Sequence, residues 1–188
     1  MSDEFKWQRH FLKMAEHVAQ QSKDPSTKVG AVIVHPETKH VLSTGYNGFP
    51  QGVKDLPERY NERALKYELV AHAEVNAIVR AGRHGISVDG CHLYVVPTLM
   101  VPSCCNNCAK YVVQAGIKKL WYWEPLKVED RWEQLAKFTR ILFDEGGVEY
   151  QAVPREVSIP EVLSNRQQEY TRTITIDERA HGHENGHH

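Results

Sequence analysis

The stretch that decides the fold is CHLYVVPTLMVPSCCNNCAKYVVQAGIKKLWYW, residues 91–123. Its first segment, CHLYVVPT, is short and rich in valine and aromatic residues, which is typical of a strand. The segment NNCAKYVVQAG predicts a helix, because it closes with glycine, a residue that suits a helix C-terminus. The run IKKLWYW predicts another strand. The whole stretch therefore reads as strand, helix and strand.

The rest of the chain continues this alternation. Apolar periodicity predicts three further helices, at residues 5–22, 71–82 and 129–144. The run KVGAVIVHP, rich in valine and isoleucine, predicts a strand at residues 28–36, and two further strands are predicted at residues 41–48 and 146–153. The strands at residues 28–36 and 41–48 look like a hairpin. Gly82 is expected to end the helix predicted at residues 71–82. Five strands interleaved with helices predict a three-layer α/β/α sandwich with a mixed five-stranded sheet.

Length and composition indicate one main domain. Of the 188 residues, we assign 1–153 to this domain and 154–188 to an appendage whose end, RAHGHENGHH, is expected to be a disordered histidine-rich tail. The formal net charge of −1 gives no general attraction for nucleic acid, and no apolar run is long enough to span a bilayer. Without an export signal we expect the cytoplasm, where clustered cysteines bind metal or catalyse rather than form disulfides.

Two short motifs carry candidate metal ligands. Cys105 and Cys108 have the CxxC spacing, which lets two thiolates point the same way from a first helical turn, whereas the adjacent Cys104 must diverge. His72 begins another short apolar helix. Together these side chains form a His-Cys-Cys set with one open coordination position, as in catalytic zinc sites. Glu74, two residues after His72, can reach the fourth ligand without binding the metal.

Each of these residues also has an ordinary interpretation. The two cysteines alone fit a redox pair, and His72 alone more often caps or packs against a helix. A structural zinc site would use four protein ligands, with Cys104 as the fourth, and would not need Glu74. The combination of both motifs favours catalytic zinc, one ion per chain.

Four stretches together resemble a known family. They are SKDPSTKVGAVIV (22–34), TGYNGFPQG (44–52), HAEVNAI (72–78) and CNNCAKYVVQAGIKKL (105–120). Through them the chain resembles the cytidine and deoxycytidylate deaminase superfamily, and within it the deoxycytidylate (dCMP) deaminases. The resemblance implies a cytidine deaminase-like fold, assembly into homo-oligomers, and zinc-dependent hydrolytic deamination of dCMP to dUMP, which feeds thymidylate synthesis.

The resemblance also implies roles for residues near the metal. Glu74 would take a proton from water and relay it to the ring nitrogen and then to departing ammonia. Asn47 would bind the sugar, although it fits a turn equally well. The backbone of Ala73 would donate to the pyrimidine carbonyl. Tyr122 would stack on the base, unless it packs in the core.

The 5′-phosphate of a nucleotide requires cationic partners. Lys28 and Lys23 lie beside the first predicted strand, which borders the pocket in the family, and we favour them. Arg59, Arg63 and Lys66 are the other nearby candidates.

The chain departs from the family pattern in two places. Cys104 stands where the family usually has proline before the first metal cysteine, and residues 49–71 contain no cysteine or histidine for the further structural zinc of some relatives. The alternative substrates are cytidine, a riboflavin or pterin precursor and tRNA adenosine. Near-neutral charge argues against tRNA, and HAEVNAI with GYNG favours a mononucleotide.

Overall fold

The computed structural model describes residues 4–126 and 132–155. The predicted tail, and the appendage from residue 156 onward, lie outside the described residues. The helices are α1 (Lys6–Ala19), α2 (Pro57–Asn61), α3 (Arg63–Leu69), α4 (Ala73–Arg83), α5 (Asn106–Gln114) and α6 (Glu133–Gly146). The strands are β1 (Gly30–Val34), β2 (Val41–Tyr46), β3 (His92–Val96), β4 (Lys119–Trp123) and β5 (Glu149–Val153).

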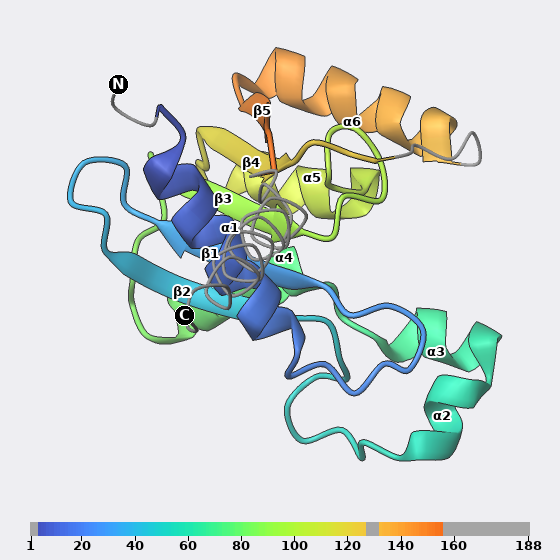
Figure 1. Ribbon diagram of the computed structural model, residues 1–188. Helices are drawn as coiled ribbons and strands as arrows, with labels where there is room; N and C mark the ends of the chain where they lie inside the picture. The colour runs from blue at the N-terminus through green and yellow to red at the C-terminus, as the bar shows by residue number, and fades with distance from the viewer. Residues whose placement is uncertain (1–3, 127–131, 156–188) are drawn as a thin grey trace, which may run out of the picture. The chain divides into compact units, whose positions relative to one another are not determined.

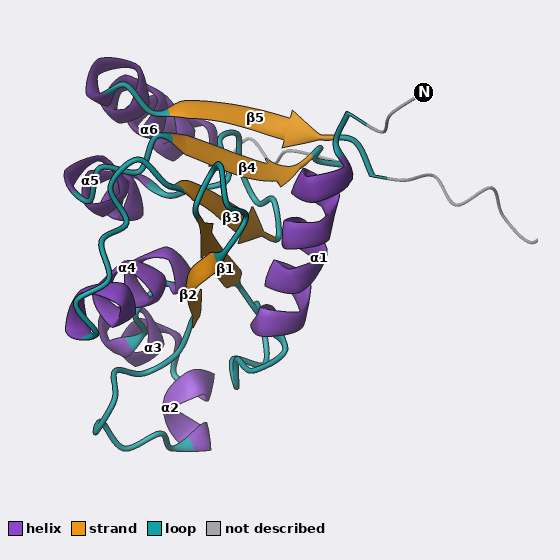
Figure 2. Cartoon of the chain, turned by 90° about the vertical axis from the view of Figure 1, so that its left-hand side faces the viewer, coloured by secondary structure: helices purple, strands orange, loops and turns teal. Residues whose placement is uncertain are grey.

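One mixed sheet organises the described residues, in the strand order β2-β1-β3-β4-β5. β1 pairs antiparallel with both β2 and β3, while β3, β4 and β5 run parallel to one another. The predicted hairpin is confirmed, with Gly30 opposite Tyr46. α1 covers one face of the sheet and α4, α5 and α6 cover the other (Figures 1 and 2). The predicted three-layer sandwich is therefore confirmed.

The three central strands, β1, β3 and β4, are buried along almost their whole length because helices cover both faces of the sheet, whereas the edge strands β2 and β5 are only partly buried. In β4, Leu120 and Tyr122 belong to the core beneath α4, α5 and α6, whereas Trp121 and Trp123 belong to the core beneath α1. Successive side chains of a strand point to opposite faces, so this alternation follows directly from the backbone. All five residues of β1 are buried for the same reason.

The helix ends agree only in part with the sequence prediction. Gly116 follows α5 with φ of 76°, so this predicted glycine terminus is confirmed. Gly82 lies in the last turn of α4, which ends one residue later than predicted, at Arg83, and the left-handed residue that follows the helix is Gly85, with φ of 68°. The predicted start of the last helix falls on residues 127–131, which lie outside the described residues.

The polar segment between β2 and α4 contains the short helices α2 and α3. α3 ends at Leu69, just before His72, so it brings its own side chains close to the start of α4. No helix within residues 4–126 and 132–155 combines the length and the apolar character needed to cross a membrane.

Candidate metal centre and active site

Two helix N-termini bring the candidate ligands together. His72 is the N-cap residue of α4 and Cys105 is the N-cap residue of α5, with nearly equal backbone angles. The His72 Nδ1 atom lies 3.3 Å from Cys105 Sγ and 3.2 Å from Cys108 Sγ. All three ligand atoms lie within 4.8 Å of one another. The structure thus gathers the two motifs, 33 residues apart in the chain, at one point.

This geometry fits a zinc ion. A tetrahedral ion bound at about 2.0 Å to nitrogen and about 2.3 Å to sulfur separates these two atoms by about 3.5 Å. The two observed nitrogen–sulfur distances are only slightly shorter. Because both sulfurs approach Nδ1, this is the ring nitrogen that faces the ion. The positive ends of α4 and α5 also favour thiolate ligands.

Cys104 lies outside this group. Its side chain is buried, and its Sγ atom lies 3.6 Å from the backbone oxygen of Cys105. Burial raises the pKa of the Cys104 thiol to about 11, so it stays protonated near neutral pH. Among the described residues, the grouped donors are His72, Cys105 and Cys108. Three protein ligands leave one position of a tetrahedron open.

The grouped side chains shift one another's pKa values. A hydrogen bond with Cys108, followed by contacts with His72, lowers the pKa of Cys105 to about 4. The hydrogen bond with Cys105 raises the pKa of His72 to about 9. The lowered pKa of Cys105 favours its thiolate, the form that binds a metal, whereas the His72 ring has to lose a proton to bind one.

Glu74 lies in the first turn of α4, two residues after His72. Its side chain is only 4% exposed, and it lines the same cavity as His72 and Cys105. Burial, and then the negative charge of Cys105, raise the pKa of the Glu74 carboxyl group. A carboxyl group with a raised pKa, placed beside a metal site, is suited to accept and release protons during a reaction.

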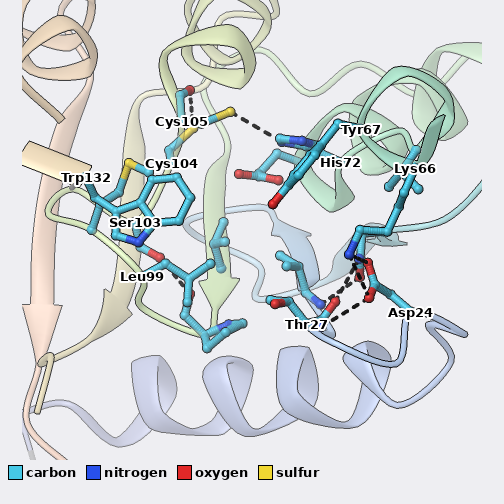
Figure 3. A pocket seen from close by; sticks show the side chains of 17 residues that line it. Asp24, Thr27, Lys66, Tyr67, His72, Leu99, Ser103, Cys104, Cys105 and Trp132 are labelled. Carbon is cyan, nitrogen blue, oxygen red and sulfur yellow. Dashed lines mark hydrogen bonds and ion pairs between the residues drawn. The ribbon is translucent and has the colours of Figure 1, made fainter. Parts of the chain in front are cut away.

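The cavity has a volume of about 210 Å³ and two chemically different ends (Figure 3). His72, Glu74 and Cys105 form the metal end. Asp24 and Lys66 lie at the other end, which we call the cationic end.

The cationic end is held by a buried ion pair. Lys66 Nζ lies 3.3 Å from each carboxylate oxygen of Asp24, and both side chains are at least nine-tenths buried. Asp24 Oδ1 also accepts hydrogen bonds from the backbone N–H groups of Ser26 and Thr27, at 2.8 and 3.2 Å. Among the described residues that line the cavity, Lys66 is the one lysine or arginine. The sequence made Lys66 one of several candidate phosphate-binding residues, and its burial beside Asp24 is what distinguishes it from the others.

Of the predicted substrate contacts, Asn47 lies at the cavity. Its Oδ1 accepts from the Val29 N–H at 2.7 Å, and its Nδ2 donates to the Thr27 carbonyl at 2.9 Å. Asn47 therefore joins the strand approach at Thr27 to the end of β2. Ala73, the first residue of α4, is fully buried.

The structure does not bring the other three predicted contacts to the cavity. Tyr122 packs in the core because its place in β4 points it toward the helices. Lys23 pairs with Asp55 at 2.9 Å, with its side chain 68% exposed, and exposed Lys28 lies 3.5 Å from the Gln20 carbonyl. None of the three is among the described residues that line the cavity.

Comparison with known proteins places the chain among deaminases. The family model "Cytidine and deoxycytidylate deaminase zinc-binding region" matches residues 5–124. An uncharacterized deaminase in the luxG 3′ region of Aliivibrio fischeri is 40% identical over 157 residues, which cover 81% of this chain and 97% of that protein. Deoxycytidylate deaminase of Pongo abelii is 41% identical over 153 residues, or 79% and 80% of the two chains.

A solved structure agrees with these relatives. The crystal structure of dCMP deaminase from cyanophage S-TIM5, in complex with dCMP and dUMP, matches with a TM-score of 0.62 and 29% sequence identity. The match covers 81% of this chain and 99% of the phage chain.

Proposed function

The chain belongs to the cytidine and deoxycytidylate deaminase family, and from this premise we propose that it deaminates dCMP to dUMP by hydrolysis. One observation carries the proposal: a single cavity is lined at one end by Glu74 and by His72 and Cys105 of the His72, Cys105 and Cys108 donor group, and at its other end by a buried lysine. This arrangement suits a substrate with a base to be attacked and an anionic group to be held.

We propose that His72, Cys105 and Cys108 hold one zinc ion per chain. When bound, zinc supplies the nucleophile, because it lowers the pKa of a water molecule toward neutrality. The close approach of the three donor atoms and the lowered pKa of Cys105 support this role. The free fourth position argues against a structural site, since that would take four protein ligands.

We assign the proton transfers to Glu74. Its carboxylate takes a proton from the attacking water and gives it to the ring nitrogen of the base as the C–O bond forms. It then takes the remaining proton of the added hydroxyl group and delivers it to the amino group, so that the C–N bond breaks, ammonia leaves and the carbonyl of the product forms. The reaction consumes one water and returns Glu74 to its starting state. Burial in the cavity keeps the carboxylate away from competing bulk water.

We propose Lys66, instead of the sequence-favoured Lys28 and Lys23, as the cation that faces the 5′-phosphate. Asp24 orients the ammonium group, and an ammonium has three donors, so one remains for a phosphate oxygen. The second hydrogen on Asn47 Nδ2 is assigned to the sugar, since the first reaches Thr27. The N–H of Ala73 lies in the first turn of α4 and therefore has no acceptor within the helix. We propose that it donates a hydrogen bond to the pyrimidine carbonyl.

The cellular setting follows as a prediction. None of the four cysteines of the described residues forms a disulfide, which fits the reducing cytoplasm where we propose that the enzyme acts. Assembly into homo-oligomers stays a prediction from the family resemblance.

A substrate series tests the proposed function. The zinc-loaded protein is mixed in turn with dCMP, CMP, deoxycytidine and cytidine, and the loss of ultraviolet absorbance from the amino-pyrimidine is followed. We expect dCMP to give the highest kcat/KM, and deoxycytidine to be much poorer because it has no phosphate for Lys66. Equal kcat/KM values for dCMP and deoxycytidine would contradict the assignment of a mononucleotide substrate.

A further inference from the structure

Helix α6 contacts the metal loop although it lies beyond the matched family region. That region ends at residue 124, and α6 begins at Glu133. The metal loop, residues 97–105, connects β3 to α5 and has neither helical nor strand structure. Figures 1 and 2 show α6 beside α5, the helix that carries both metal cysteines at its start. The loop therefore depends on its neighbours for a fixed shape.

Three side chains of α6 and its N-cap reach this loop or the cavity beside it. Thr139 Oγ1 donates a hydrogen bond to the Cys104 carbonyl at 2.9 Å, and Arg140 donates to the Val101 carbonyl at 2.8 Å. Trp132, the N-cap residue of α6, lines the cavity. Among these, Thr139 is completely buried, and its partner Cys104 directly precedes the metal ligand Cys105.

The Thr139 hydrogen bond fixes a peptide plane that leads into Cys105. The carbonyl of Cys104 and the N–H of Cys105 belong to the same planar peptide group. Holding the carbonyl fixes this plane, so it fixes the φ angle of Cys105, which is −74° at the N-cap of α5. This backbone orientation sets the direction of the Cα–Cβ bond of Cys105. The Sγ atom, which also accepts a hydrogen bond from the Cys108 N–H at 3.4 Å, lies 3.3 Å from His72 Nδ1.

The hydroxyl has a second acceptor nearby. Leu135 O, one turn earlier in α6, lies 3.2 Å from Thr139 Oγ1. A hydroxyl donates one hydrogen at a time, and the shorter contact is with Cys104. The Leu135 carbonyl lies within α6, where it can accept a backbone N–H of the helix. The Cys104 carbonyl belongs to an irregular loop, so it depends more on the Thr139 hydroxyl.

We propose that Thr139 is a positioning residue for the metal centre, and that its hydroxyl orients the Cys104–Cys105 peptide so that the Cys105 thiolate faces the ion. Partners behind metal ligands typically change metal affinity by 10–100-fold. Thr139 acts through one peptide group, so we expect about the lower end of that range. This inference rests on the metal-binding part of the proposed function and is independent of the substrate.

The test compares Thr139→Val with Thr139→Ser. Valine keeps the shape of threonine without the hydroxyl, and serine keeps the hydroxyl without the methyl group. Zinc affinity is measured by competition with a chromophoric chelator, and the Co²⁺-substituted proteins are compared by visible absorption. For Thr139→Val we expect about 10-fold weaker zinc binding and a shifted Co²⁺ spectrum. For Thr139→Ser we expect values close to those of the unmodified protein.

A matched variant separates positioning from general stability. Ser43 is also buried and donates a hydrogen bond to a backbone carbonyl, that of Ala77, at 2.7 Å. We expect Ser43→Ala to lower the melting temperature but to leave zinc affinity and the Co²⁺ spectrum unchanged. If Thr139→Val does not fold, Thr139→Ala takes its place, with the same expected loss of affinity.

Two results would overturn the proposal. One is unchanged zinc affinity and an unchanged Co²⁺ spectrum in Thr139→Val. The other is an equal loss in Thr139→Val and Thr139→Ser, which would assign the effect to the methyl group. A failure of the unmodified protein to bind zinc would instead contradict the metal centre itself, so the two failures are distinguishable.

Discussion

The two ends of the cavity are built in different ways. At the metal end, the ligands and Glu74 come from two compact motifs, and each motif sits at the first turn of a helix. At the cationic end, Asp24 and Lys66 are 42 residues apart and meet through loop and helix packing. The metal end can therefore be read in a short stretch of sequence, whereas the cationic end exists only in the folded chain.

The largest effect is expected at the metal end, from Glu74→Gln. Glutamine has nearly the shape of glutamate but cannot carry the proton, and general acid–base catalysis contributes about 10²–10⁴-fold. We expect kcat for dCMP to fall by about 10³-fold while zinc content stays at one ion per chain. Activity and metal content are measured on the same sample.

A neighbouring glutamate serves as the control for this prediction. Glu68 is exposed on α3, and Glu68→Gln should leave kcat unchanged. If Glu74→Gln retained more than a few per cent of the activity with its zinc present, the carboxylate would not be the proton carrier. The metal end would then lack the group that makes it catalytic.

The fold and the metal end could be predicted from the sequence because their signals are local. Strand and helix periodicities lie within five to fourteen residues, so they identified all five strands and the helices that cover the sheet. Helix ends were predicted less accurately. Glycine is a residue type that suits a helix terminus, but α4 continues one residue past Gly82. The metal end could be predicted because the spacing of the functional residues within the motifs at residues 72–74 and 105–108 is visible in the sequence itself.

The cationic end could not be predicted in this way. Lys23 and Lys28 are near the pocket in sequence, yet Lys23 turns to Asp55 and Lys28 stays exposed. Lys66 is the same residue type as Lys23 and Lys28, and nothing in its neighbouring sequence marks it as buried. Its burial depends on where α3 lies relative to Asp24. Tyr122 shows the same limit: strand alternation gives two possible faces, and only the assembled sheet decides which face packs beneath α4, α5 and α6 and which beneath α1.

A second prediction concerns how closely α4, which carries the metal end, lies on the sheet. A side chain at Gly45 in β2 would place its Cβ 2.2 Å from the Ala73 carbonyl oxygen and 2.5 Å from the Ala77 nitrogen. Both are backbone atoms and cannot move aside. We expect Gly45→Ala to lower the free energy of unfolding by about 3 kcal/mol, the upper range for overpacking. Denaturant unfolding of the metal-free protein measures this value.

Gly82→Ala is the matched control on α4. A Cβ at Gly82 meets nothing within 4 Å, and the residue is helical, so alanine should raise the free energy of unfolding by about 0.5–1 kcal/mol. Equal effects of the two substitutions would mean that α4 is not pressed against β2. The position of His72 would then need another explanation than this contact.

The smallest effect is expected at the cationic end, where the single substitution is a poor test. Lys66→Met alone would leave the Asp24 carboxylate buried without its partner, which destabilises the fold for reasons unrelated to substrate. The double variant Lys66→Met/Asp24→Asn removes both charges, and asparagine keeps an oxygen for the Ser26 and Thr27 N–H groups. A hydrogen bond to a charged group contributes about 1.5–3 kcal/mol, so we expect KM for dCMP to rise by about 30-fold.

The same variant should treat deoxycytidine as the unmodified enzyme does, because that substrate has no phosphate to lose contact with Lys66. Lys28→Met, which removes an exposed lysine from the sequence-favoured position, should change neither substrate's KM. A rise in KM for Lys28→Met with no rise for the double variant would return phosphate binding to the residue that the sequence alone favoured. The contrast between the two ends would then disappear, since both could be predicted from neighbours in the chain.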